Sequence, residues 1–187
     1  TINAYANGDK SELGATTKSH NVKATPDALV TLNDVKVLGS TSSNAVMAEG
    51  GDFVLNNVDI EGAAKGTGIR INNTKSLVTG TNVTINGCNY GISYNGNIDI
   101  TGLTCNATTT NVEITGGTFN VKDATFGKTT GSNVLVKGGA ITLEKATING
   151  TSGTEDAYGI EVSKGTINLK GDIVLQDTKS VSYTHLT

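Results

Sequence analysis

The chain has 187 residues, of which 24 are Gly, 29 Thr and 20 Asn, while aromatic residues make up 4% and charged residues 17%. This composition excludes a helical bundle or coiled coil, which would be rich in Ala, Leu, Glu and Lys, and the 36% of apolar residues exclude a disordered chain. The net charge of -3, with no long basic run, excludes nucleic acid as an expected partner.

The stretch from Thr1 to His20 is polar and does not repeat. Thr1-Ile2-Asn3 is similar to Thr147-Ile148-Asn149, which ends a later repeat. We therefore expect residues 1–20 to hold the end of a preceding coil followed by a long polar loop. An uncapped coil at this end suggests that the chain is cut from a longer stack.

From Asn21 onward the chain repeats itself. Seven segments share the pattern Gly or Asn, apolar, any residue, apolar, with Ala45 as the exception in first place; they are residues 21–24, 45–48, 68–71, 91–94, 111–114, 133–136 and 159–162. Successive segments therefore begin at intervals of roughly 20 to 26 residues, and a period of this size is typical of a solenoid.

Two further alternating segments follow in each unit. The second segment supplies the apolar residues Val30/Leu32, Phe53/Leu55, Val78, Ile98/Ile100, Phe119/Val121, Ile141/Leu143 and Ile167/Leu169. The third supplies Val35/Val37, Val58/Ile60, Val83/Ile85, Leu103/Cys105, Ala124/Phe126, Ala146/Ile148 and Ile173/Leu175. Period-two alternation broken by Gly and Asn predicts short strands with one face inward. An inserted residue near Gly171 leaves the register of the last unit open.

These patterns predict an all-β fold, a single-stranded right-handed parallel β-helix of about seven coils with three short strands per coil, over residues 21–181. Right-handed crossovers dominate parallel sheets. Corners such as Gly50-Gly51, Gly116-Gly117 and Gly138-Gly139 offer positive φ angles. Residues 182–187 depart from the pattern, and we expect them to be an irregular tail that is not native. No apolar run approaches the roughly 18 residues of a membrane-spanning helix.

Threonines mark a possible binding face. The outward position of the third strand is Thr84, Thr104, Thr125 and Thr147 in four successive coils. Ice-binding solenoids carry flat threonine arrays, usually two columns wide. The companion outward positions are neither small nor uniform; they are Asn82, Gly102, Asp123 and Lys145. Ice binding is therefore a minor alternative to plain β-propensity and hydroxyl stacking.

Residues for catalysis or metal binding are sparse. His20 and His185 are the only histidines, and Cys88 and Cys105 lack metal-ligand company. No two acidic residues are adjacent in one outward column, so we expect no catalytic residues, no metal and no cofactor. The long loop of residues 150–158 carries Glu155-Asp156, a possible binding loop.

Two sets of residues resemble a known family. Gly138-Gly139-Ala140-Ile141 and Phe53-Val54-Leu55-Asn56 are similar to the GGA-I and F-x-x-N tetrapeptides of polymorphic outer-membrane proteins. Tyr158-Gly159-Ile160-Glu161-Val162, followed by Gly165-Thr166-Ile167-Asn168-Leu169, resembles repeats of bacterial autotransporter adhesin passenger domains. This resemblance implies a β-helix displayed outside a bacterial cell and carries over no catalytic residue.

The expected function is therefore that of a non-enzymatic extracellular adhesin segment. Its expected partners are a host-surface glycan or protein, or a second copy of itself. The alternative is a carbohydrate-active β-helix, such as a polysaccharide lyase, a hydrolase or a tailspike-like part. A groove with two or more carboxylates beside Arg70 or a lysine would favour this alternative, because elimination by a lyase and hydrolysis by a hydrolase both use such groups.

Overall fold

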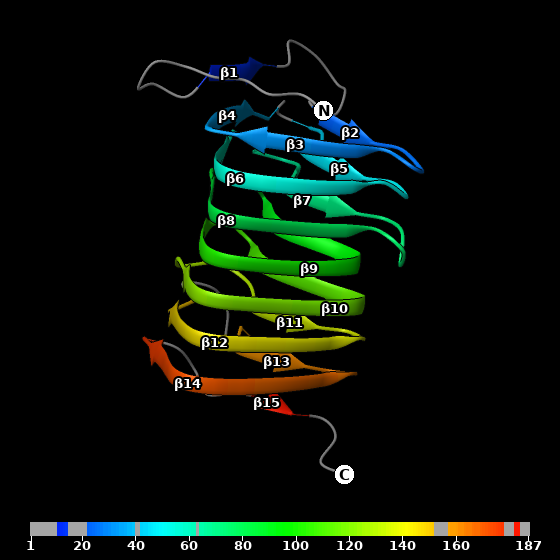
Figure 1. Ribbon diagram of the computed structural model, residues 1–187. Helices are drawn as coiled ribbons and strands as arrows, with labels where there is room; N and C mark the ends of the chain where they lie inside the picture. The colour runs from blue at the N-terminus through cyan, green and yellow to red at the C-terminus, as the bar shows by residue number, and fades with distance from the viewer. Residues whose placement is uncertain are drawn as a thin grey trace.

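The chain winds into a β-solenoid. The computed structural model describes residues 11–14, 22–39, 42–62, 64–151, 157–177 and 182–183. Within these ranges every regular element is a β-strand, and the 15 strands pair in parallel as one continuous sheet. The coils stack along one axis from the N-terminal to the C-terminal end and wind with a right hand (Figure 1). The predicted fold class, an all-β right-handed parallel β-helix, is confirmed.

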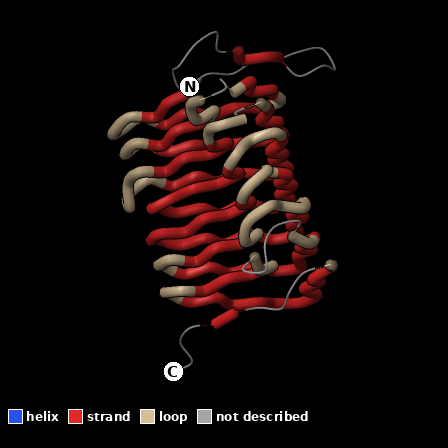
Figure 2. Tube along the Cα trace, turned by 180° about the vertical axis from the view of Figure 1, so that it is seen from behind, coloured by secondary structure: helices blue, strands red, loops and turns tan. Residues whose placement is uncertain are grey.

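Three faces make up the wall of the helix. The first face consists of β2 (Val22–Ala24), β5 (Val46–Ala48), β7 (Thr67–Ile71), the starts of β9 (Tyr90–Asn106) and β10 (Thr110–Phe126), β11 (Val134–Val136), β13 (Ile160–Val162) and β15 (Ser182–Tyr183). The second and third faces consist of β1 (Ser11–Gly14), β3 (Leu29–Asn33), β4 (Val35–Leu38), β6 (Asp52–Glu61), β8 (Leu77–Asn86), the rest of β9 and β10, β12 (Ala140–Asn149) and β14 (Thr166–Gln176). The loops stack in two rows beside the first face (Figure 2).

The pairing register follows the sequence repeat. On the first face the residues paired in succession are Val22, Val46, Ile69, Ile92, Val112, Val134 and Ile160. Six turns therefore separate Val22 from Ile160, and β14 completes a seventh coil, so we number the coils one to seven from β2. The insertion near Gly171 is confirmed, because the pairing of β12 with β14 shifts between Glu144 and Ala146.

The strands are longer than the three short ones predicted for each coil. In coils four and five all three segments join, so that β9 and β10 each have 17 residues. The pairing of β9 with β10 resumes after each corner; the register shifts between Ile114 and Gly116, and Asp123 and Gly102 at the next corner are not among the paired residues. A repeat pattern locates inward residues, but it does not show whether the backbone stays paired between them.

The corner between the second and third faces depends on left-handed backbone conformations. The corner residues with positive φ are Asp34, Asn57, Asn82, Gly102, Asp123, Lys145 and Gly171. Asn and Asp tolerate this conformation better than other side chains do, and Gly adopts it freely. The predicted corner glycine Gly117 has a φ of 81°, and a Cβ on it would lie only 1.7 Å from the oxygen of Gly96. Gly117 is thus required by both conformation and space.

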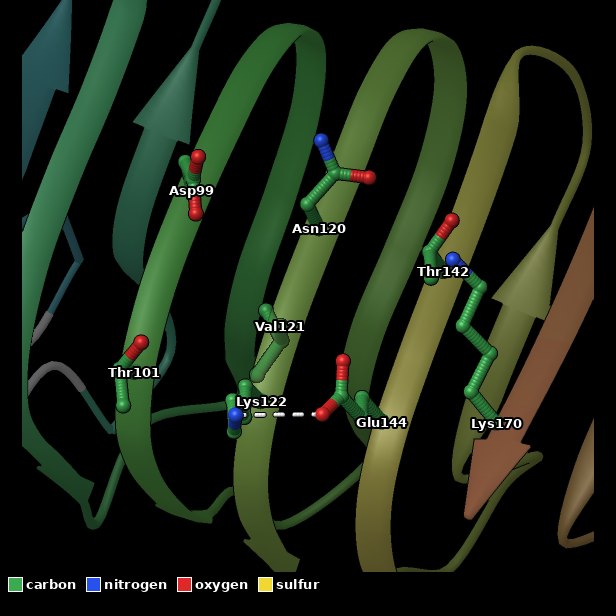
Figure 3. A pocket seen from close by; sticks show the side chains of 8 residues that line it. All are labelled: Asp99, Thr101, Asn120, Val121, Lys122, Thr142, Glu144 and Lys170. Atoms are coloured by element: carbon green, nitrogen blue, oxygen red, sulfur yellow. Dashed lines mark ion pairs between the residues drawn. The ribbon is translucent and has the colours of Figure 1, made fainter.

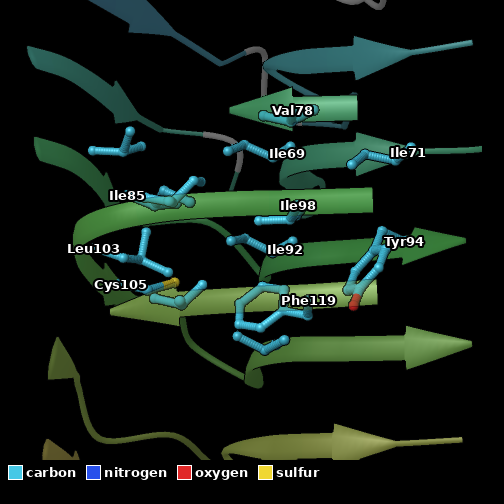
Figure 4. Packing of buried hydrophobic residues seen from close by; sticks show 14 of the residues in the cluster. Ile69, Ile71, Val78, Ile85, Ile92, Tyr94, Ile98, Leu103, Cys105 and Phe119 are labelled. Carbon is cyan, nitrogen blue, oxygen red and sulfur yellow. The ribbon is translucent and has the colours of Figure 1, made fainter. Parts of the chain in front are cut away.

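The core is a narrow column of apolar side chains (Figure 4). Most are Val, Ile and Leu, and the bulkiest fully buried side chains are Tyr94, Phe53, Phe119 and Phe126. Cys105 occupies an inward position in register with Ile85 and Phe126, as the repeat predicts. Side chains of this size fill the space between three closely spaced faces at normal packing density.

Buried asparagine side chains occupy one inner corner in coils five and six. Asn111 and Asn133 are both fully buried, and the Asn111 amide nitrogen donates to Oδ1 of Asn133 at 2.8 Å. Nδ2 of Asn133 donates to the carbonyl oxygens of Gly127 and Asn149, each at 2.8 Å. The Gly127 carbonyl also accepts from Nδ2 of Asn111 at 2.7 Å, so the two asparagines together tie the turns of neighbouring coils to one another.

Strands at both ends extend the repeat beyond the expected boundaries. β1, within residues 1–20, pairs with β4 on the third face, whereas Thr1-Ile2-Asn3 lies outside the described residues. β15 pairs in register with Glu161 and Val162, although residues 182–187 were expected to be irregular.

Candidate functional site

An open groove lies on the outer surface of the second face in coils four to seven. It has a volume of about 380 Å³. The residues that line it are Asp99, Thr101, Asn120, Val121, Lys122, Thr142, Glu144 and Lys170 (Figure 3). The side chain of Val121 points into the core and is buried, so the outward side chains of the groove are all polar or charged. This surface suits a ligand that forms many hydrogen bonds.

Strand register places these side chains in two columns. Asp99, Asn120 and Thr142 are paired in successive coils and form the first column. The second column consists of the residues two positions further along each strand, which are Thr101, Lys122, Glu144 and Lys170. Residues i and i+2 of a strand point to the same side, so both columns face outward together. The coils are spaced ~4.8 Å apart, which gives the groove a regular polar lattice.

An ion pair lies in the middle of the groove. Nζ of Lys122 is 3.1 Å from Oε1 of Glu144 on the next coil, and the two side chains are 47% and 39% exposed. An ion pair this exposed contributes about 0–1 kcal/mol to stability. Asp99 lies before this pair along the axis and Lys170 lies after it. Neither side chain has a hydrogen-bond or ion-pair partner within the described part of the chain.

Three other ion pairs on the outer wall join neighbouring coils in the described part of the chain. Lys36 contacts Glu61 at 2.9 Å on the third face, and Lys137 contacts Glu113 at 3.2 Å beside the first face. Lys23 also forms an ion pair with Glu49. The groove thus differs from these places, because it combines a paired acid and base with one free charge of each sign.

Sequence reasoning missed most of this groove. It searched the outward columns for adjacent acidic residues, but it did not follow the column of alternating charge that contains Lys122, Glu144 and Lys170. The signal was present, because Lys122, Glu144 and Lys170 occupy the same register position in three successive repeats. Opposite charges at matching positions of neighbouring repeats indicate contact between coils.

The threonine face predicted from sequence forms one column. Thr84, Thr104, Thr125 and Thr147 pair in register on the third face. The column continues to Asp59 at one end and Val174 at the other. Its companion column is the corner with positive φ angles, where the side chains turn away from a flat plane. The hydroxyl array is therefore one column wide, unlike the two-column arrays of ice-binding solenoids.

The predicted binding loop falls largely outside the part of the chain that the structure describes. Glu155 and Asp156 both lie among the residues that are not described. On either side of them Thr151 pairs with Thr129 and Ala157 is buried. A binding role for Glu155 and Asp156 therefore stays a prediction.

The groove holds the two carboxylates and the lysines that the carbohydrate-active alternative requires. Asp99 and Glu144 are two coils and two residues apart, so their backbone positions are separated by roughly 12 Å. Glycoside hydrolysis uses carboxyl groups about 5 to 9.5 Å apart. Glu144 is also held by Lys122. Among the described residues, no three His, Cys, Asp or Glu side chains are grouped so that they could hold a metal ion.

The two cysteines lie inside the core, away from the groove. Cys88 and Cys105 are both fully buried, and neither forms a disulfide. Burial raises the pKa of the Cys105 thiol far above its ordinary value, and the nearby Cys88 adds to this shift. A thiol that stays protonated is a weak nucleophile. Cys105 therefore serves as a packing residue, as expected from its position in the repeat.

Comparisons with known proteins assign the chain to no family. No protein-family model matches the chain, and no match was found among curated proteins or among solved structures. In the ranges that the structure covers, there is no helix with the length and apolar character needed to cross a membrane.

Proposed function

We propose that this β-helix is a non-enzymatic adhesin segment at a bacterial cell surface and that it binds a glycan in the groove of coils four to seven. The observation that carries the proposal is the groove itself, with hydroxyl, amide and charged side chains in two straight columns. The resemblance to autotransporter passenger domains supports an extracellular location. A host-surface glycan is the partner that this chemistry favours.

The groove offers the kinds of groups that recognise sugars. Asn120 supplies an amide, Thr101 and Thr142 supply hydroxyls, and Asp99 supplies a carboxylate acceptor. Together these groups match the donors and acceptors of sugar hydroxyls. They stand on paired β-strands in the middle of a sheet, so little conformational entropy is lost when a ligand binds.

A glycan fits this groove better than a peptide does. Peptides anchor through apolar side chains in pockets or add a strand to a free sheet edge. Three of the four strands of the groove offer neither feature, because β9, β10 and β12 are each paired on both sides, whereas β14 pairs only with β12 among the described residues. A sugar chain needs neither, and the ~4.8 Å repeat of the coils is close to the advance of one hexose in an extended chain.

A glycan array with the purified chain tests the proposal. We expect binding to one class of extended oligosaccharide, followed by its loss in the variant Asp99→Ala/Asn120→Ala/Thr142→Ala. These side chains are outside the core, so the fold is retained. The matched control is Thr104→Ala/Thr125→Ala, which truncates two outward residues of the same coils on the third face.

Each outcome has a clear meaning. Binding that the groove variant abolishes and the control retains supports the proposal. The proposal is wrong if the native chain binds no glycan on the array, or if both variants bind as well as the native chain.

A carbohydrate-active β-helix is the second candidate, and the pair Asp99 and Glu144 beside two lysines favours it. In this case the chain would shorten an oligosaccharide that it binds. Chromatography of the bound glycan after prolonged incubation tests for cleavage. Cleavage that Asp99→Asn or Glu144→Gln abolishes would establish this candidate. If the glycan stays intact, the chain binds it without acting on it, and the carbohydrate-active candidate is wrong.

A further inference from the structure

Resting on the proposed function, we infer that the groove selects a zwitterionic glycan, which carries protonated amines and carboxylates on one chain. The ligand would lie along the helix axis, with an amine against Asp99 in coil four and a carboxylate against Lys170 in coil seven. The inference rests on the arrangement of four charges in one groove.

The two free charges have opposite signs and stand at opposite ends. Asp99 and Lys170 are three coils apart, or roughly 14 Å along the axis. Both are exposed, and neither has a side-chain partner among the residues that the structure describes. A ligand group of opposite charge can therefore approach each of them without first breaking an ion pair.

The charges between them are already balanced. Lys122 and Glu144 neutralise each other at 3.1 Å. A purely anionic glycan would be attracted by Lys170 but repelled by Asp99. A purely cationic glycan would be attracted by Asp99 but repelled by Lys170. Like-charge contacts oppose binding as opposite charges favour it. Only a ligand that carries both positive and negative charges can form a favourable electrostatic contact at both ends of the groove.

The side chains in the groove orient the ligand as well. Figure 3 shows Asp99 and Thr101 on β9 at one side, and Lys170 extending from β14 toward Thr142 at the other. The sequence of charges along the groove is acid, base, acid, base from coil four to coil seven. The amine-bearing part of the ligand would thus point toward the N-terminal end of the helix.

Four tetrasaccharides with one backbone of alternating glucuronate and glucosamine test this inference. The first carries free amines and carboxylates, the second is N-acetylated, the third is carboxyl-reduced, and the fourth has both changes. Calorimetry in slightly acidic buffer of low ionic strength compares their affinities. We expect the first to bind tightest and each single change to weaken binding about three- to fivefold, as for one exposed ion pair.

Variants assign each preference to one residue. Asp99→Asn should remove the effect of N-acetylation and keep that of carboxyl reduction, whereas Lys170→Gln should do the opposite. The matched controls Asp27→Asn and Lys75→Gln change the same charges on exposed turns of coils one and three. They should leave both preferences intact.

The possible failures are distinct. Equal binding of all four tetrasaccharides, or tightest binding of the N-acetylated one, overturns the zwitterionic selectivity but leaves glycan binding standing. If none of them binds while another glycan on the array binds in the groove, the selectivity is again wrong. If no glycan of any kind binds, the proposed function fails and the inference fails with it. Tighter binding of a Lys/Glu peptide than of any sugar would overturn the ligand class.

Discussion

Tyr94 and Phe119 stack inside the β-helix with ring centroids 5.7 Å apart and an angle of 26° between the rings. Tyr94 is 2% exposed, and its hydroxyl is the only buried side-chain polar atom without a hydrogen-bond partner in the described part of the molecule. An unpaired buried hydroxyl costs free energy, because water no longer solvates it. The contact between the two rings therefore stabilises the fold, whereas the unpaired hydroxyl of Tyr94 destabilises it.

Replacing this hydroxyl should stabilise the protein. We expect Tyr94→Phe to raise the free energy of unfolding by about 1 kcal/mol, since the ring packing stays and the unpaired oxygen is lost. Urea unfolding followed by circular dichroism measures the change. Phe119→Ala serves as the comparison and should cost about 3–5 kcal/mol through a cavity. A loss of stability in Tyr94→Phe would show that the hydroxyl has a partner.

Alkaline solution should destabilise the fold through two buried groups. Burial raises the pKa values of Tyr94 and Cys105 above their ordinary values of 10.0 and 9.0. The unfolded chain therefore loses these protons at a pH where the folded chain keeps them, so the stabilising effect is complete below pH 9.0 and is lost as the pH rises. Each group should lower the free energy of unfolding by about 1.4 kcal/mol per pH unit above its ordinary pKa.

Unfolding curves measured at a series of alkaline pH values test this dependence. The variant Tyr94→Phe/Cys105→Ala removes both groups and should show a shallower decline than the native chain. The comparison uses the slope of the free energy of unfolding against pH, so a constant difference in stability between the two proteins does not affect it. Equal slopes would mean that the two groups titrate alike in the folded and unfolded states.

Gly91 should not tolerate a side chain. A Cβ at this position would lie 2.1 Å from Sγ of Cys105 and 2.6 Å from the oxygen of Asn111. We expect Gly91→Ala to lower the free energy of unfolding by about 3 kcal/mol or more, because the neighbouring coil must shift. Gly131→Ala, where the nearest atom is 3.1 Å away, should cost less than about 1 kcal/mol. Thermal unfolding compares the two, and similar losses would contradict this account.

The buried asparagines should matter more than the exposed ones. Asn133→Ala removes two donated hydrogen bonds and one accepted from Asn111, so one N–H of the buried Asn111 amide loses its acceptor and the Asn149 carbonyl loses this donor, whereas the Gly127 carbonyl still accepts from Asn111 at 2.7 Å. We expect a loss of about 3 kcal/mol or more. Asn56 donates one bond of 2.8 Å to Asn33 and accepts one of 3.2 Å from Thr81 nearer the solvent, so Asn56→Ala should cost about 1 kcal/mol. Chemical denaturation of both variants gives the comparison, and equal losses would contradict it.

The sequence by itself determined the coil. The inward pairs, from Val30/Leu32 to Ile173/Leu175, fall in register as the alternation predicts. Even the insertion near Gly171 was visible, because Ile173 follows Leu169 by one residue more than Ala146 follows Leu143, and the register shift between Glu144 and Ala146 absorbs this extra residue. A strictly periodic pattern with small apolar residues leaves few alternatives to a solenoid, and Gly and Asn at the corners agree with it.

Only the tertiary structure decided which outward residues share a site. Lys122, Glu144 and Lys170 lie in three different repeats, and their alignment in one column depends on the length of the loops between them. The same stacking left Asp99 and Lys170 without partners among the described residues while it joined Lys122 to Glu144. Inward positions are constrained by burial, which the sequence reports directly. Outward positions are constrained by register between neighbouring coils, and that register becomes specific only when the coils are stacked.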